Sequence, residues 1–142
     1  MARVSTYLNF QGTAREAFAV YGTLFGTEPQ EVVTYAEIGM PDLLPGEEAM
    51  WMHAEIEILA GHVLMATDML ESMGHQTRVG NNTTINLEPD TRDEADRIWA
   101  ELSKDSTEFA PLADAPWGAY WGTCLDRFGI RWMFNVYDEP KS

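Results

Sequence analysis

The chain has 142 residues, of which 45% are hydrophobic and 23% are charged, as in one ordinary folded domain. Its net charge of −14 disfavours nucleic acid as a partner and would favour a positively charged ligand. Because the carboxylates are spread along the chain and not clustered, the simpler interpretation is that the charge keeps the protein soluble. The single cysteine excludes an internal disulfide framework, and no apolar run reaches the roughly 18 residues that span a bilayer. With no signal-peptide pattern either, we expect a cytoplasmic protein without membrane association.

The first half of the chain predicts a strand, a helix and three more strands. Residues 4–10 alternate as a strand does. Thr13 and Glu16 then form the pattern of a capping box, in which the hydroxyl caps the helix and the carboxylate reaches back, and Gly26 offers a left-handed stop. Further strands are expected over 32–37, 50–59 and 62–68, the last two joined as a hairpin. The segment 40–48, rich in Pro and Gly, is expected to be a mobile loop and a candidate lid.

The second half repeats this order. A strand over 84–88 precedes a second capping-box pattern at Thr91 and Glu94, which starts a helix to about residue 103. Strands are expected over 107–112, 119–125 and 130–137. The chain is therefore one domain of two βαβββ modules, at about 1–70 and 83–142, with a linker over about 71–82.

Several stretches carry a family resemblance. They are Tyr7-Leu8-Asn9-Phe10, Ala14-Arg15-Glu16-Ala17, Met52-His53-Ala54-Glu55 with Met65 and Asp68, and Trp117-Gly118 followed by Gly122, Asp126-Arg127-Phe128-Gly129 and Trp132. With them the chain resembles the vicinal-oxygen-chelate (glyoxalase/bleomycin-resistance) superfamily, and within it the PhnB-like branch. The resemblance implies an α+β fold in which the two βαβββ modules form a curled mixed sheet around a cavity, commonly in a homodimer.

Members of that branch often carry a 3-demethylubiquinone methyltransferase-like label, which the residues do not support. The chain has no strand–GxGxG–helix element for an adenosyl cofactor and is too short for a doubly wound domain beside the two modules. We expect no cofactor.

The resemblance also locates the metal ligands of the superfamily. In its metal-using members each module gives one His, Glu or Gln from its first strand and one from its last. Those positions correspond here to Ser5, Met65, Thr84 and Met133. Two thioethers and two hydroxyls are a poor set for a divalent ion, so we expect no metal.

Strand alternation divides the two faces of each sheet. The residues expected to face the helices are Leu8, Phe10, Leu64, Ile85, Leu87, Trp132 and Phe134. The neutral residues predicted to bind a small molecule are Ser5, Tyr7, Asn9, Met65, Thr67, Thr84, Asn86, Trp121, Met133 and Asn135. The alternative is an interior filled by its own side chains.

Two further clusters have both a functional and a structural interpretation. His53, Glu55 and Glu57 share one strand face, either as a metal or acid–base cluster or as a polar face at solvent or a dimer seam. The aromatic residues Trp51, Trp117, Tyr120 and Trp121 could stack on a flat cation or form core and dimer contacts. Asp126 is expected to bond its own turn, and Cys124 to be buried.

Three functions remain open. The first is a metal-free protein that binds a small molecule in the cavity between its two modules, as a homodimer with sites partly at the seam. Sequestration of a cationic aromatic drug is a role that fits the acidic, tryptophan-bearing surface. The second is a metal-dependent lyase, isomerase or dioxygenase that uses His53 and Glu55. The third is a metal-free enzyme with Tyr7 or Asp68 as acid or base. The sequence leaves open whether any reaction is catalysed.

Overall fold

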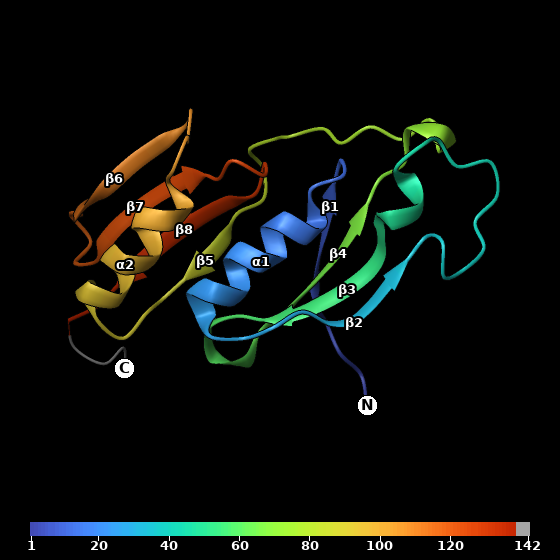
Figure 1. Ribbon diagram of the computed structural model, residues 1–142. Helices are drawn as coiled ribbons and strands as arrows, with labels where there is room; N and C mark the ends of the chain where they lie inside the picture. The colour runs from blue at the N-terminus through green and yellow to red at the C-terminus, as the bar shows by residue number, and fades with distance from the viewer. Residues whose placement is uncertain (139–142) are drawn as a thin grey trace. The chain divides into compact units, whose positions relative to one another are not determined.

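The computed structural model describes residues 1–138 and divides the chain into two compact units (Figure 1). Unit 1, Met1–Arg78, contains β1 (Thr6–Phe10), α1 (Ala14–Phe25), β2 (Gln30–Thr34), β3 (Trp51–Glu57) and β4 (Val63–Asp68), with 3-10 turns η1 (Glu47–Ala49), η2 (Leu59–Gly61) and η3 (Glu71–Met73). Unit 2, from Val79, contains β5 (Ile85–Leu87), α2 (Arg92–Leu102), β6 (Phe109–Asp114), β7 (Tyr120–Leu125) and β8 (Arg131–Val136).

Each unit is a βαβββ module with its own four-stranded sheet. The strand orders are β1-β4-β3-β2 and β5-β8-β7-β6. The first strand of each module runs parallel to the last, and the other neighbours are antiparallel. The α+β fold class is therefore confirmed, and the mixed sheet is present as two four-stranded sheets, one in each unit.

One helix covers one face of each sheet, and the predicted core layer lies beneath it (Figure 1). The side chains of Phe10, Leu64, Trp132 and Phe134 are almost completely buried, whereas Ile85 is only partly so. The register agrees with the predicted alternation, because Leu8 pairs with Ala66 across β1 and β4. A one-residue slip would have moved every one of these side chains to the other face.

The strand β2 begins two residues earlier than predicted and is irregular. Its pairing with β3 shifts register between Gln30 and Val33, and Glu31 between them has a left-handed backbone with φ of 53°. Bulges of this kind are common on edge strands, where they bend the strand and re-aim a side chain. The alternation of polar and apolar residues in the sequence could not predict this bulge in β2.

The two helices start differently, although their sequences carry the same pattern. The hydroxyl of Thr91 accepts a hydrogen bond from the Glu94 N–H at 3.1 Å, as predicted. Thr13 makes no side-chain cap, so the predicted capping box is wrong there. The acceptor for the first turn of α1 is instead Asp68, whose Oδ1 lies 3.0 Å from the Ala14 nitrogen.

The candidate lid is anchored at its end. Glu47 is buried, with Oε1 accepting from the Leu44 N–H at 2.9 Å and Oε2 from the Ser72 N–H at 3.2 Å. These bonds tie the loop to η3, in the segment expected to be the linker. Among residues 1–138, no helix has the length and apolar character that crossing a membrane requires.

Candidate functional site

The open face of the unit 1 sheet, opposite α1, carries a row of polar side chains. Tyr7 on β1 pairs with Met65 on β4, and Met65 pairs with Glu55 on β3. His53, two residues before Glu55, projects to the same face. The structure thus brings together two groups that the sequence suggested separately: the predicted ligand-binding residues Tyr7 and Met65, and the polar pair His53 and Glu55.

Tyr7, His53 and Glu55 are joined by hydrogen bonds. The Tyr7 hydroxyl lies 2.9 Å from His53 Nδ1, and His53 Nε2 lies 3.1 Å from Glu55 Oε2. The two rings are tilted by 40° with their centres 5.7 Å apart. Arg3 approaches the other carboxylate oxygen at 3.5 Å, but its side chain is 56% exposed, so this pair adds little stability.

The surroundings of Tyr7 keep its hydroxyl protonated. Partial burial raises its pKa above the ordinary value, and the nearby Tyr35 and Glu55 raise the pKa further. The residue is still 45% exposed. Tyr7 therefore places a neutral and partly exposed phenol on the open face.

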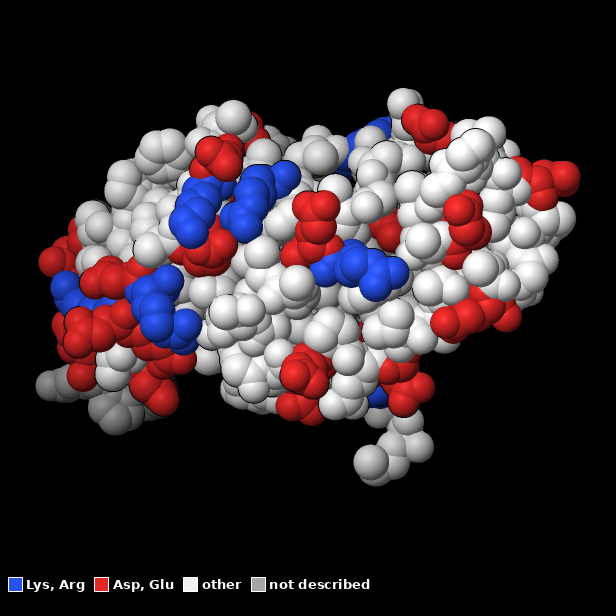
Figure 2. All heavy atoms as spheres, viewed as in Figure 1, with Lys and Arg blue, Asp and Glu red and all other residues white. Residues whose placement is uncertain are grey.

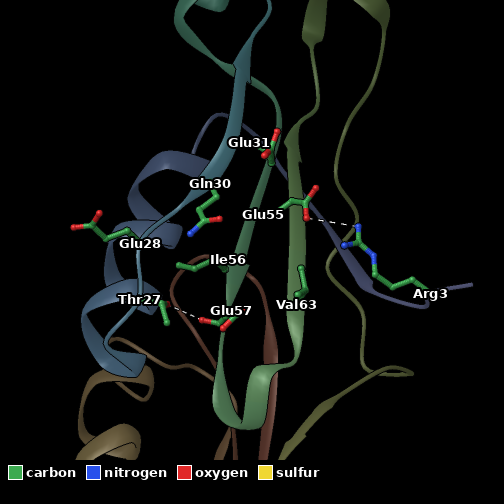
Figure 3. Close-up of a pocket in the computed structure, with 9 residues that line it drawn as sticks. All are labelled: Arg3, Thr27, Glu28, Gln30, Glu31, Glu55, Ile56, Glu57 and Val63. Atoms are coloured by element: carbon green, nitrogen blue, oxygen red, sulfur yellow. Dashed lines mark hydrogen bonds and ion pairs between the residues drawn. The ribbon is translucent and has the colours of Figure 1, made fainter. Parts of the chain in front are cut away.

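A pocket of about 380 Å³ adjoins this row through Glu55 (Figure 3). It is lined by Arg3, Thr27, Glu28, Gln30, Glu31, Glu55, Ile56, Glu57 and Val63. The lining thus contains four carboxylates and one guanidinium, and Figure 3 shows the Glu55 side chain directed towards Arg3. The volume lies within the range of small-molecule sites, and the charge of the lining favours a cation.

None of the ten residues predicted to bind a ligand lines this pocket. In unit 1, Tyr7, Asn9, Met65 and Thr67 lie on the open sheet face beside it, since Asn9 pairs with Thr67. The Thr67 hydroxyl lies 3.2 Å from that of Tyr35. Ser5 precedes β1, and its Oγ is buried without a hydrogen-bond partner among the described residues.

The other five lie on or next to the open face of the unit 2 sheet. Asn86 pairs with Met133, Asn135 pairs with Trp121, and Thr84 precedes β5. Asn135 Nδ2 donates to Asn86 Oδ1 at 2.8 Å, and Asn86 Nδ2 donates to Glu88 at 3.1 Å. Around Met133 this face offers amides, a thioether and an indole, with the charged Glu88 and Arg131 at its margins.

The aromatic cluster is divided between core and surface. Trp51 is buried and meets Phe18 edge to face, which places it in the core. Trp117 is 58% exposed and contacts Trp121 at 5.7 Å between ring centres. The Tyr120 hydroxyl donates to Asp96 at 2.6 Å.

Two buried aspartates hold the framework of the units. The carboxylate of Asp68 accepts the N–H groups of Ala14 and Trp51, so both of its oxygens are occupied by backbone donors. This arrangement gives Asp68 a structural role and leaves Tyr7 as the better acid–base group. Asp126 accepts from its own turn, as predicted, and from the Trp132 indole.

Cys124 is completely buried, as the sequence indicated. Burial, with the nearby Asp126 charge, raises the pKa of its thiol to about 12. A thiol this hard to ionise is a poor nucleophile and a poor metal ligand at neutral pH.

The residues at the metal positions of the superfamily do not fit a divalent ion. Met65 and Met133 offer only thioethers, and Ser5 and Thr84 only hydroxyls. Among the described residues, no three His, Cys, Asp or Glu side chains are grouped so as to hold a metal. His53 and Glu55 form a pair without a third ligand of that kind.

Sequence reasoning did not identify the pocket. Its residues Arg3, Thr27 and Glu28 lie outside the regular elements, and Glu31 sits at the bulge of β2. The only usable signal was the position of Glu55 and Glu57, two residues apart on one strand face.

Known proteins share both the sequence pattern and this fold. The family model described as 3-demethylubiquinone-9 3-methyltransferase matches residues 2–134. The chain belongs to this family. Protein YjdN of Escherichia coli K12 is 25% identical over 148 residues, which cover 98% of each chain.

Solved structures of relatives superpose closely. Protein PA1353 of Pseudomonas aeruginosa has a TM-score of 0.82 at 27% identity, covering 96% of this chain and 98% of its own. The PhnB protein of Bacillus cereus has a TM-score of 0.80 at 24% identity, covering 95% and 99%. A glyoxylase/bleomycin resistance protein/dioxygenase domain of Frankia, at 12% identity, has a TM-score of 0.62 and covers 96% of each chain, which shows the shared fold.

The name of the family refers to a methyl transfer, for which many enzymes use a doubly wound fold that differs from this one. Adenosyl-dependent methyltransfer on a doubly wound sheet needs parallel strands alternating with helices. Each unit here has one helix and a mixed four-stranded sheet. The chain therefore belongs to the family without having the doubly wound fold of such a methyltransferase, and its likeness to the glyoxylase-type domain is one of fold.

Proposed function

We propose that this PhnB-like protein binds a small, positively charged organic molecule in the pocket of unit 1, without a metal ion. The observation that carries the proposal is the composition of the pocket lining, which contains four glutamates and a single basic residue, Arg3. A volume of about 380 Å³ suits a molecule of drug or metabolite size.

Other features of the molecule support a cation. The net charge of −14 raises the local concentration of positive ligands around the whole surface. Figure 2 shows carboxylates scattered over the visible face, with the basic side chains lying beside acidic ones. Ile56 and Val63 add apolar surface to the pocket, on which an aromatic or aliphatic body can rest.

The proposal is tested with benzamidine and its uncharged analogue benzamide, which differ little in shape. Calorimetric titration should show benzamidine bound more tightly than benzamide. Glu57→Gln should weaken benzamidine by about five- to tenfold, the effect of roughly 1 kcal/mol from one surface charge, and leave benzamide unchanged. Glu88→Gln, in unit 2, is the matched control and should change neither. Equal binding of the two compounds would contradict the proposal.

The metal-dependent alternative makes a different prediction. If His53 and Glu55 held a catalytic metal, protein purified without a histidine tag would contain a stoichiometric divalent ion. We expect less than about one-tenth of an equivalent, because two side chains make a weak site for zinc. A full equivalent that His53→Gln removes would overturn the metal-free proposal.

A further inference from the structure

The hydrogen bonds of His53 determine where the protons of the row lie. The Glu55 carboxylate can only accept a hydrogen bond, so Nε2 of His53 carries the proton in that contact. In the neutral ring Nδ1 then has a free lone pair and accepts the Tyr7 proton. The row is therefore directional, from the Tyr7 hydroxyl through the imidazole to the carboxylate.

This direction leaves the Tyr7 oxygen with lone pairs that can still accept a proton. Its own proton points to a base, and Tyr7 is 45% exposed as a residue. Because the phenol stays neutral, it cannot act as a preformed phenolate. Any chemistry at this oxygen needs His53 to take the proton as the new bond forms.

We propose that Tyr7 is a catalytic acid–base residue, with His53 as the base that accepts its proton and Glu55 as the positioning residue that fixes the tautomer of His53. This activity goes beyond binding and concerns a different set of side chains from the pocket lining, with Glu55 shared. Nothing in the predicted metal positions takes part.

In the proposed step a ligand loses a proton to the Tyr7 oxygen. The ligand's bond to hydrogen breaks and its electron pair stays on the ligand, while an O–H bond forms at Tyr7. At the same time the original Tyr7 O–H bond breaks and an N–H bond forms at Nδ1, giving an imidazolium beside the Glu55 carboxylate. The substrate class is an organic cation whose reacting atom carries the proton, a choice that rests on the proposed function of the adjacent pocket.

The reaction of Tyr7 with benzenesulfonyl fluoride tests whether His53 accepts the Tyr7 proton, and it needs no known substrate. The Tyr7 oxygen forms a bond to sulfur, the S–F bond breaks, fluoride leaves, and the phenolic proton passes to His53. Peptide mass spectrometry follows the rate at Tyr7, with Tyr120 as an internal reference because its hydroxyl bonds to Asp96 instead. Failure of labelling would leave benzamidine binding unaffected, so the two proposals fail separately.

The variant His53→Gln keeps a hydrogen-bond acceptor near Tyr7 but removes the base. We expect the labelling rate at Tyr7 to fall about 100-fold, within the range that general bases contribute, with Tyr120 unchanged. A rate within twofold of the native protein would overturn the proposal. His53 is partly exposed on a strand face, so the variant should fold, which circular dichroism checks.

Chemical rescue separates a base from a structural contact. In His53→Ala, added imidazole should restore Tyr7 labelling in proportion to its concentration and leave Tyr120 unaffected. A merely structural role of His53 predicts no rescue, and that result would overturn the proposal.

The role of Glu55 has a spectroscopic signature. Nitrogen-15 NMR of the native protein should show His53 protonated on Nε2 and free on Nδ1. In Glu55→Gln we expect a mixture of the two tautomers and slower labelling of Tyr7. An unchanged tautomer and an unchanged rate would remove Glu55 from the proposed site.

Discussion

The two units share one framework but present different chemistry on their open sheet faces. Met65 in unit 1 pairs with Tyr7 and Glu55, and the equivalent Met133 in unit 2 pairs with Asn86 and Thr123. Glu55 and Thr123 are therefore equivalent positions, and two residues earlier on the same strands His53 is equivalent to Trp121. Tyrosine, histidine and glutamate in one unit thus correspond to asparagine, tryptophan and threonine in the other.

This difference shows which part of a duplicated module is free to change. The face against the helix must stay apolar, because it supplies most of the folding free energy. The open face carries no such constraint, so one copy can place ionisable groups beside its central methionine while the other places an amide, an indole and a hydroxyl there. The candidate proton-transfer row lies in unit 1 alone among the described residues.

The two cores also distribute their volume differently. The last strand is small in unit 1, with Ala66, and large in unit 2, with Phe134 at the equivalent position. In unit 1 the bulk comes from the helix, through Phe18 and Tyr21. The compensation indicates that each core is packed as its own set.

The largest expected effect follows from removing the Phe134 ring from the core of unit 2. Phe134→Ala should reduce the free energy of unfolding by about 3–5 kcal/mol, since the ring is completely buried and its loss leaves a cavity. Phe134→Leu is the control and should cost clearly less. Denaturant unfolding measures both free energies. A cost for Phe134→Ala below about 1 kcal/mol would contradict the view that unit 2 depends on the bulk of this ring.

A smaller effect distinguishes the two helix starts. Thr91→Ala should cost about 1 kcal/mol, because it removes the acceptor for the Glu94 N–H. Thr13→Ala should cost much less, since Asp68 already supplies the acceptor for α1. Equal costs in denaturant unfolding would mean that Thr13 caps its helix after all.

The smallest effect concerns the loop between β2 and β3, which is much longer than its counterpart between β6 and β7. Hydrogen bonds, first from Ser72 and then from Leu44, hold the pKa of Glu47 below its ordinary value. The folded state therefore gains stability from Glu47 above the unfolded pKa and loses it as pH falls through the folded pKa. Thermal unfolding should show Glu47→Gln less stable than the native protein at pH 7, with the difference shrinking by pH 3. A difference independent of pH would contradict this account.

Much of the fold could be predicted from the sequence, because it depends on local patterns. The alternation around Leu64 and Trp132 identified the buried faces, and the repeated Thr–Glu pattern identified both helices. The cap of α1 could not be predicted, since its acceptor Asp68 lies 54 residues away. The bulge at Glu31 likewise depends on how β2 meets β3.

The candidate site was only partly predictable for the same reason. Tyr7 and Met65 were expected on the open face, and the hairpin of β3 and β4 was expected as well. Its register was not, because η2 includes Ala60 with a left-handed backbone, and this connection decides which residues face each other. Only that register places Glu55 beside Met65 and brings His53 to Tyr7.

The central claim is that the ligand chemistry of this protein lies in unit 1. An amide NMR titration with benzamidine tests it most directly. The account predicts that the largest shifts fall on β3 and the start of β2, around Glu55 and Glu57, with little change around Thr123 and Asn135 of unit 2. Shifts concentrated on β7 and β8, with β3 unaffected, would contradict it.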